Sequence, residues 1–237
     1  MAAQKFGRAG KSAREMAEKR YLVRICFGLL GLSICWVILK ALPHLQHAGI
    51  PAIILGFVIF KLGTSWVESQ MDRKIKEEKR ATRGAKGEER LGAILDQLDE
   101  KHVVFHDVVS PYGNIDHIVV AETGVFVIET KAHGGRVSVA TGELLVNGHP
   151  PEKDFIRQTL RNSYWLKERI LDLTGIEPWI NPVIVFTNAF VEPGRAIKGT
   201  TITNKKFLLQ TVERLGRRND KNFKVWSMRE KLVCLVP

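Results

Sequence analysis

The stretch that decides the fold is NIDHIVVAETGVFVIETK, residues Asn114–Lys131. It contains two runs rich in Val, Ile and Phe, Asn114–Ala121 and Val125–Lys131, on either side of the turn residues ETG at 122–124. Two such runs joined by a short turn that contains Gly are typical of a β-hairpin. The stretch therefore predicts two neighbouring antiparallel strands.

Hairpin geometry brings three charged residues of this stretch together. If Glu122-Thr123 form a two-residue turn, Asp116 lies opposite Glu129, with Cβ atoms about 5 Å apart. Lys131 is two residues further on and shares the same face. A turn at Thr123-Gly124, lengthened symmetrically, would place Asp116 opposite Lys131 and keep all three on one face, whereas a one-residue offset would separate them.

Two carboxylates at this separation repel each other and favour a bound cation. Hard oxygen ligands with open coordination positions suit Mg²⁺ or Mn²⁺. Such an ion polarises a phosphodiester and activates a water, and a nearby ammonium stabilises the developing charge. For Asp116, Glu129 and Lys131 alone, the alternative is a simple cross-strand ion pair.

Helices and further strands surround the hairpin in the sequence. Leu91, Ile94, Leu95 and Leu98 follow the glycine-containing segment 84–87 at helical spacing, which predicts a helix over Glu88–Glu100 with Glu88 in its first turn. The other expected helices are Lys153–Leu173 and, capped by Asn204, Lys205–Leu215. The other expected strands are His102–Val109, Arg136–Ala140, Glu143–Asn147, Asn181–Thr187 and Lys231–Val236.

Five motifs occur in a characteristic order. They are Gly84-x-x-Gly87-Glu88, NIDHIVV from Asn114, GVFVIETK from Gly124, Gln158-x-x-x-Asn162 in a helix, and PVIVFT from Pro182. In this order they resemble the nuclease-related domain family, a branch of the PD-(D/E)xK nucleases. The resemblance implies a restriction-endonuclease-like α/β fold, a mixed sheet flanked by helices.

The resemblance also implies roles for individual residues. Asp116 and Glu129 match the metal-binding acids, and Lys131 matches the catalytic lysine. Glu88 matches an acidic residue of the first core helix that contacts metal or water, and Gln158 matches a polar residue that helps to place the site or the substrate. Ile115 stands where the superfamily name has Pro.

The remaining polar residues carry weaker signals. Alternation along the strand turns His117 away from Asp116 and favours a structural role, and His106 and Asp107 are expected at the surface or at a strand edge. The basic residues of the expected helix Lys153–Leu173 are expected on a solvated face, with contact of some of them to a nucleic-acid backbone as the alternative. They are Arg157, Arg161, Lys167 and Arg169.

The N-terminal third is basic and apolar. Residues 1–87 hold 16 Lys and Arg against 6 Asp and Glu, and residues 88–237 hold 20 against 19. The later part therefore lacks the broad basic footprint of a protein that coats nucleic acid. Leu22–Leu42 is long enough for a transmembrane helix of about 30 Å. Residues 48–67 predict a second span, for which Lys61 leaves open an interfacial, re-entrant or buried core helix.

Basic residues before the first run and after the second, with none in the connector Ala41–Gly49, predict that both termini lie in the cytoplasm. The expected protein is a two-span protein of the cell membrane, with a transmembrane hairpin before the domain and the lipid bilayer as a partner. The expected segments are a basic N-terminus at 1–21, spans at 22–42 and 48–67, a charged linker at 68–83, the nuclease-related domain at 84–200, and a C-terminal helix and strand at 201–237.

Two functions follow from these observations. The first is a membrane-tethered, Mg²⁺- or Mn²⁺-dependent nuclease that hydrolyses phosphodiester bonds in nucleic acid, with DNA favoured over RNA. The second is a binding or scaffold module that keeps the nuclease fold without turnover. The intact set of two acids and a lysine favours the enzyme, and the nearly neutral charge of residues 88–237 favours the scaffold.

Overall fold

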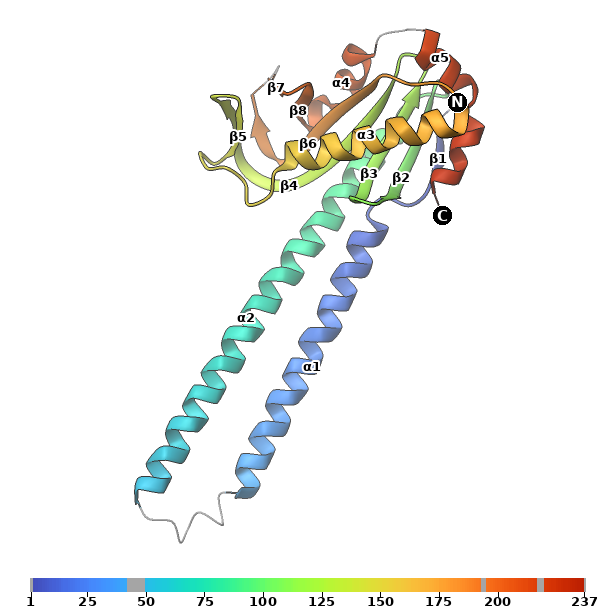
Figure 1. Ribbon diagram of the computed structural model, residues 1–237. Coiled ribbons are helices and arrows are strands. Elements are labelled where there is room, and N and C mark those ends of the chain that lie inside the picture. Colours follow the sequence, from blue (N-terminus) through green and yellow to red (C-terminus); the bar gives the residue numbers. More distant parts are fainter. Residues whose placement is uncertain (1, 42–49, 193–194, 217–219, 237) are drawn as a thin grey trace. The chain divides into compact units, whose positions relative to one another are not determined.

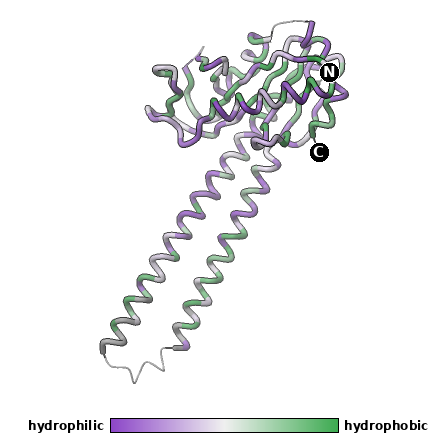
Figure 2. Tube along the Cα trace, viewed as in Figure 1, coloured by the Kyte–Doolittle hydropathy of each residue, from purple (hydrophilic) through white to green (hydrophobic). Residues whose placement is uncertain are grey.

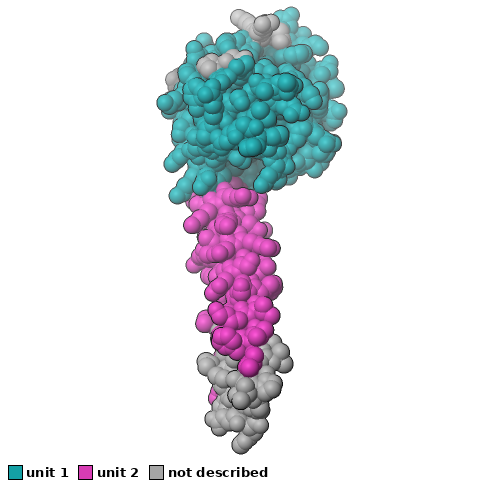
Figure 3. All heavy atoms as spheres, turned by 90° about the vertical axis from the view of Figure 1, so that its left-hand side faces the viewer, with its two compact units in different colours: residues 1–12, 83–237 teal, residues 13–82 magenta. Residues whose placement is uncertain are grey.

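A computed structural model describes residues 2–41, 50–192, 195–216 and 220–236. The chain divides into two compact units, which Figure 3 distinguishes by colour. One unit comprises residues 13–82. The other comprises residues 1–12 and 83–237, so the first twelve residues belong to the same unit as the C-terminal part of the chain.

The unit 13–82 is built from two long helices, α1 (Lys11–Ala41) and α2 (Ile50–Leu95), the second of which continues into the other unit. Arg20 Nη1 of α1 donates to the carbonyl oxygen of Glu77 at 3.0 Å, and Arg24 forms an ion pair with Glu78 at 2.7 Å. Polar contacts therefore join the two helices within this unit.

The expected transmembrane hairpin and the membrane location derived from it are wrong. In the part of the chain that the structure describes, no helix has an apolar stretch long enough to cross a membrane. The uncharged run between Arg24 and Lys40 has 15 residues, which at about 1.5 Å per residue is shorter than the hydrocarbon core of about 30 Å. In α2, which begins at Ile50, Lys61 interrupts the apolar residues, and hydrophilic residues predominate after Val67 (Figure 2). The connector at 42–49 lies outside the described residues.

A mixed sheet forms the centre of the other unit (Figure 1). Among the described residues it has eight strands, and the order along its main path is β1-β2-β3-β4-β6-β8-β7, with β5 paired to β4. The strands are β1 (Gln4–Phe6), β2 (His102–Ser110), β3 (Gly113–Ala121), β4 (Gly124–Ala140), β5 (Glu143–Val146), β6 (Ile180–Val191), β7 (Arg195–Ile197) and β8 (Thr200–Asn204). Strands β2, β3 and β4 are antiparallel, whereas β4, β6 and β8 are parallel.

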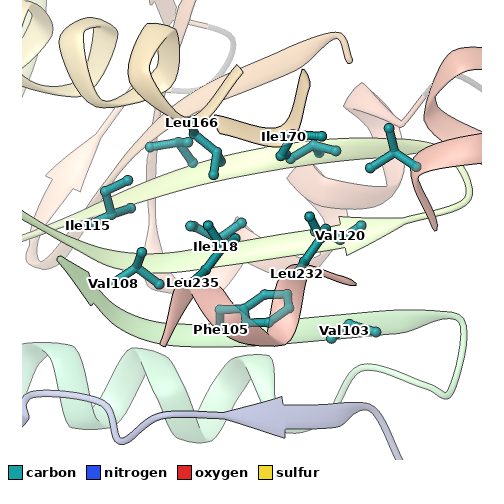
Figure 4. Close-up of a cluster of buried hydrophobic side chains, with 13 residues drawn as sticks. Val103, Phe105, Val108, Ile115, Ile118, Val120, Leu166, Ile170, Leu232 and Leu235 are labelled. Carbon is teal, nitrogen blue, oxygen red and sulfur yellow. The ribbon is translucent and has the colours of Figure 1, made fainter. Parts of the chain in front are cut away.

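Helices cover both faces of this sheet, which confirms the expected mixed sheet flanked by helices. Because side chains alternate along a strand, Ile118 and Val120 pack on one side with Leu166 of α3 (Phe155–Thr174), as Figure 4 shows. That side also receives α5 (Asp220–Ser227) and the 3₁₀ helix η3 (Arg229–Leu235). Val119 packs on the other side with the last turns of α2 and with α4 (Leu208–Leu215).

The hairpin prediction is confirmed in register. Ala121 pairs with Gly124, so Glu122-Thr123 form the two-residue turn. The helix Lys205–Leu215 is also present, as the 3₁₀ turn η2 (Lys205–Phe207) followed by α4, and the Asn204 side chain accepts from the Lys206 N–H at 3.0 Å. By contrast, the expected closing strand Lys231–Val236 is wrong, because these residues form most of η3.

The glycine-containing segment 84–87 does not begin a helix. Helix α2 passes through it without interruption, so the expected position of Glu88 in a first turn is wrong and Glu88 lies well inside α2. Gly87 instead permits a close approach, because a Cβ there would lie 3.2 Å from Thr187 Oγ1 and 3.3 Å from the Ala132 Cβ. Helical glycines can therefore serve packing against a sheet rather than helix termination.

The N-terminal segment was not expected in the sheet. Strand β1 pairs in parallel with β2, Phe6 stacks on Phe105 with ring centroids 5.2 Å apart, and Ala3 is buried in the core. A three-residue strand is too short for its periodicity to be detected in a sequence.

Candidate functional site

The candidate site lies where strands β3 and β4 part. Their ladder runs from Ala121–Gly124 to His117–Ile128 and ends there. Beyond that point β3 continues against β2, and β4 continues against β6, where Glu129 is opposite Ile184. Asp116 and Glu129 are the next residues of the two strands, so the two acids occupy the fork. We call Asp116, Glu129, Lys131, Gln158 and Glu88 the fork cluster.

Asp116 bridges the fork through its side chain. Its Oδ2 accepts from the backbone N–H of Thr130 at 2.6 Å, where the ladder no longer supplies a partner. Burial raises the pKa of Asp116 well above its usual range, and the charges of Glu129 and Glu88 raise it further. The Lys131 ammonium and the Thr130 N–H oppose this shift only in part. Like charges have therefore been gathered here at a cost in free energy.

Glu129 is buried and held from two directions. Its Oε1 accepts from Lys131 Nζ at 2.7 Å and from Gln158 Nε2 at 2.8 Å, and Gln158 Oε1 accepts from the same ammonium at 3.1 Å. Its other oxygen, Oε2, is buried and has no hydrogen-bond partner among the residues that the structure describes. Burial raises the pKa of Glu129, against the opposing effect of Lys131. An orphaned carboxylate oxygen in this position is costly unless a ligand satisfies it.

The ammonium of Lys131 is fixed by an aromatic ring as well. Its Nζ lies 4.5 Å from the ring centroid of Phe155, at the beginning of α3. The side chain is only 12% exposed. Phe155 could not be recognised from the sequence, because an aromatic residue in the first turn of an amphipathic helix carries no signal beyond core packing.

Glu88 approaches the cluster from α2. Burial, together with the charges of Asp107 and Glu129, raises its pKa to about 7. A carboxyl group with a pKa near neutrality is able to hold or release a proton under physiological conditions. The residues expected from the sequence are thus brought together by four elements, β3, β4, α3 and α2.

Asp107 is the nearby residue whose position was not expected. It has a positive φ of 57° and interrupts the pairing of β2 with β3 between His106–His117 and Val108–Ile115. Its carboxylate accepts from the Ser12 N–H at 2.8 Å, from the Ser12 hydroxyl, and from Asn114 Nδ2 at 2.7 Å. Asp is enriched among residues with positive φ, but nothing in the sequence distinguishes this Asp from others in strands.

His106 and His117 form a buried pair on the neighbouring rung. Their Nδ1 atoms are 2.8 Å apart, and burial lowers the pKa of both. His117 is fully buried, as its expected structural role requires. The expectation of a surface position for His106 is wrong, since it is only 4% exposed.

The donor set at the fork suits a hard cation, although it is small. Within the described residues, no group of three His, Cys, Asp or Glu side chains is arranged to hold a metal ion. Asp116 and Glu129 nevertheless offer carboxylate oxygens, and in the described part of the chain Glu129 Oε2 has no hydrogen-bond partner. Oxygen donors of this kind fit Mg²⁺, which commonly binds through one or two carboxylates together with water and substrate oxygens.

Comparison with known families agrees with this geometry. Residues 83–187 match the sequence profile of the nuclease-related domain. A nuclease-related domain therefore spans residues 83–187. This domain contains the whole fork cluster, and it suggests a nuclease-like function, binding of nucleic acid and use of a divalent metal.

Comparison with individual proteins adds one relative. An uncharacterised protein of Bacillus anthracis is 39% identical over 84 residues, which are 33% of this chain and 40% of the relative. The chain thus spans less than half of the length of this curated relative. No solved structure matches the chain significantly.

Proposed function

We propose that this protein hydrolyses phosphodiester bonds in nucleic acid, with the fork cluster as its active site. The observation that carries the proposal is the convergence of two carboxylates, an ammonium and an amide at the point where β3 and β4 separate. The match of residues 83–187 to the nuclease-related domain supports it independently.

In this proposal the acids and the lysine have different tasks. Asp116 and the unpartnered oxygen of Glu129 hold Mg²⁺ or Mn²⁺, which when bound supplies Lewis-acid polarisation of the phosphate and a more acidic water. The ammonium of Lys131, restrained by Gln158 and by the Phe155 ring, stabilises the negative charge that develops on the phosphoryl oxygens.

Glu88 serves as the proton acceptor in the same scheme. Its pKa of about 7 matches the condition for a general base that works near neutral pH. Gln158 is a positioning residue, since its amide contacts both Glu129 and Lys131 and fixes their separation.

The direct test is cleavage by the full chain. The full chain is required because β1, from residues 4–6, is part of the sheet. Labelled single-stranded and duplex DNA and RNA are incubated with Mg²⁺, with Mn²⁺ and with EDTA. The proposal predicts metal-dependent cleavage by the wild-type chain, none by Asp116→Asn, and cleavage slower by about 10²–10⁴-fold in Lys131→Ala. DNA is the expected better substrate.

The scaffold function predicts a different pattern in the same assay. A module without turnover would bind nucleic acid or protein and leave every substrate intact, whatever the metal. Cleavage that survives in Asp116→Asn would point to a contaminating nuclease and would contradict the proposed site.

A further inference from the structure

A pocket of about 740 Å³ lies beside the N-terminal half of α3, outside the fork cluster. Its lining comes from α3 and the segment before it, from β5, and from the end of β7, which lie near one another in Figure 1. Its lining includes two arginines, two aromatic residues and three acids, namely Arg157, Arg161, Phe155, Tyr164, Glu143, Glu152 and Asp154. The volume is within the range of about 300–1,000 Å³ that is usual for small-molecule sites.

The pocket and the fork cluster share contact with one residue, the buried Phe155. Phe155 lines the pocket and also carries the Lys131 ammonium on its ring, at 4.5 Å from the centroid. Gln158, which contacts Glu129, follows three positions later on the same helix. A polymer bound at the fork cluster therefore has a continuation available along α3.

The helix presents a stripe of cations and an aromatic ring to this pocket. Arg157, Arg161 and Tyr164 are exposed and spaced at i, i+4 and i+7, which places them on one face of α3. Within the described residues neither arginine takes part in an ion pair. The Arg161 guanidinium instead lies over the ring of Tyr112, with Cζ 4.2 Å from the centroid.

The pocket also contains carboxylates, which excludes a simple anion site. Glu143, Glu152 and Asp154 contribute to the lining beside the cations. Asp154 is already engaged, because its side chain accepts from the Arg157 N–H at 2.9 Å and caps α3. The other two carboxylates are hydrogen-bond acceptors, which complement the amino groups on the edges of bases.

We propose that this pocket binds an unpaired nucleotide of the substrate strand, next to the phosphate that is cleaved. Tyr164, 64% exposed, stacks on the base, and Arg157 and Arg161 bind the flanking phosphates. The inference rests on the proposed function and narrows it to strands with unpaired bases. Exposed aromatic rings interleaved with cations are typical of single-strand binding, because a duplex keeps its base faces stacked.

The test measures binding apart from cleavage. Fluorescence anisotropy of a labelled twelve-nucleotide strand, DNA or RNA, is followed with the full chain carrying Asp116→Asn and without divalent metal. In this background Tyr164→Ala should weaken binding about 5-fold or more, the lower end of measured losses of base stacking, whereas Tyr164→Phe should bind normally. Arg157→Ala and Arg161→Ala should each make the affinity less dependent on salt. The slope of log affinity against log salt should become less negative by about 0.7 in each variant.

The matched control is Arg169→Ala. Arg169 is an exposed arginine of the same helix that does not line the pocket, so its loss removes the same charge from α3 without touching the stripe. Melting curves by circular dichroism establish that each variant is folded.

Three results would overturn the inference. The first is an unchanged affinity for the single strand in Tyr164→Ala. The second is a change of the salt slope in Arg169→Ala as large as that in Arg157→Ala and Arg161→Ala. The third is a duplex of the same length that binds as tightly as the single strand. Metal-dependent cleavage by the wild-type chain, measured in parallel, separates the two proposals. Cleavage with no effect of the pocket variants overturns the pocket alone, and pocket-dependent binding without cleavage overturns only the proposed catalysis.

Discussion

The two ends of the β3–β4 pair differ in what they contribute. At the turn, Val119, Val120, Val125 and Phe126 are fully paired and fully buried, and every side chain adds to one of the two apolar layers. At the other end the ladder stops, and Asp116 and Glu129 are gathered with raised pKa values. One end stabilises the fold, and the other end is paired less well and carries charges that burial disfavours.

The contrast indicates that the fork is maintained for chemistry rather than for stability. Buried like charges persist only where the surrounding structure compensates for them. Here the compensation comes from the Thr130 N–H, the Gln158 amide and the Lys131 ammonium. Substitutions at the two ends should accordingly separate activity from stability.

The largest effect is expected at Lys131. Lys131→Ala removes the charge at the fork and should lower the rate of cleavage by about 10²–10⁴-fold, the range for loss of a positioned catalytic group. The control is Lys167→Ala on α3, whose ammonium pairs with Glu177 at 2.7 Å. The measurement is the rate of cleavage of one substrate with enzyme in excess. An equal loss of activity in Lys131→Ala and Lys167→Ala would contradict the account.

The next effect is expected in the apolar layer. Ile118→Ala, at a fully buried position of β3, should reduce the free energy of unfolding by about 2–5 kcal/mol because it leaves a cavity. Urea unfolding of the full chain measures this change. Under conditions in which it is folded, Ile118→Ala should cleave within a few-fold of the wild-type rate. A loss of activity as large as that of Lys131→Ala would contradict the claim that one end of the β3–β4 pair serves stability and the other serves catalysis.

A smaller effect, dependent on pH, is expected from Glu88. Its folded pKa of about 7 lies above its ordinary value of 4.5. Between these values the unfolded chain ionises first, so this residue makes the protein less stable as the pH rises from about 4.5 to 7, by up to about 3 kcal/mol.

Glu88→Gln should therefore be more stable than the wild type at pH 7.5 without metal, and the difference should shrink at pH 5. The two histidines have lowered pKa values and lose stability in the opposite direction, as the pH falls below about 6.5. The contribution of the histidines is the same in Glu88→Gln and in the wild type, so it cancels when the two proteins are compared at one pH. A difference that is independent of pH would mean that Glu88 is not buried among like charges.

The smallest effect is expected at Val109, which is 59% exposed and lies on β2 beyond the interruption at Asp107. Val109→Thr keeps the branched side chain and should change stability by less than about 0.5 kcal/mol, with normal cleavage. Thermal melting and the cleavage assay are the measurements. A loss of cleavage in Val109→Thr would mean that any substitution near the fork, and not only one of a charged residue, lowers activity.

The sequence predicted the local elements around the fork because they depend on short-range patterns. Two runs rich in Val, Ile and Phe on either side of a glycine-containing turn were sufficient for the hairpin, and the turn at Glu122-Thr123 gives the observed register. The expected helix Lys153–Leu173 lies within two residues of the observed bounds of α3, although its Asp154 cap was not foreseen. The grouping of Asp116, Glu129 and Lys131 followed from the register.

Other features depend on contacts between distant parts of the chain. The pairing of residues 4–6 with 103–105 spans about a hundred residues, and no local pattern encodes it. The fork itself arises because the β3–β4 ladder stops after His117–Ile128, while β3 remains paired with β2 and β4 with β6, which the hairpin pattern does not predict. The apolar runs of α1 and α2 were interpreted as membrane spans, although only 15 uncharged residues lie between Arg24 and Lys40 and Lys61 interrupts the second run.

The central claim is that the fork cluster binds a divalent metal through Asp116, and thermal melting with and without Mn²⁺ tests it most directly. In the wild-type chain Mn²⁺ should raise the melting temperature by several degrees, since binding at about 100 times the Kd adds about 2.7 kcal/mol. Asp116→Asn should melt higher than the wild type without metal, because one like charge is gone, and it should show no response to Mn²⁺. A wild-type chain whose melting temperature does not change with Mn²⁺, or an equal response in both proteins, would contradict the account.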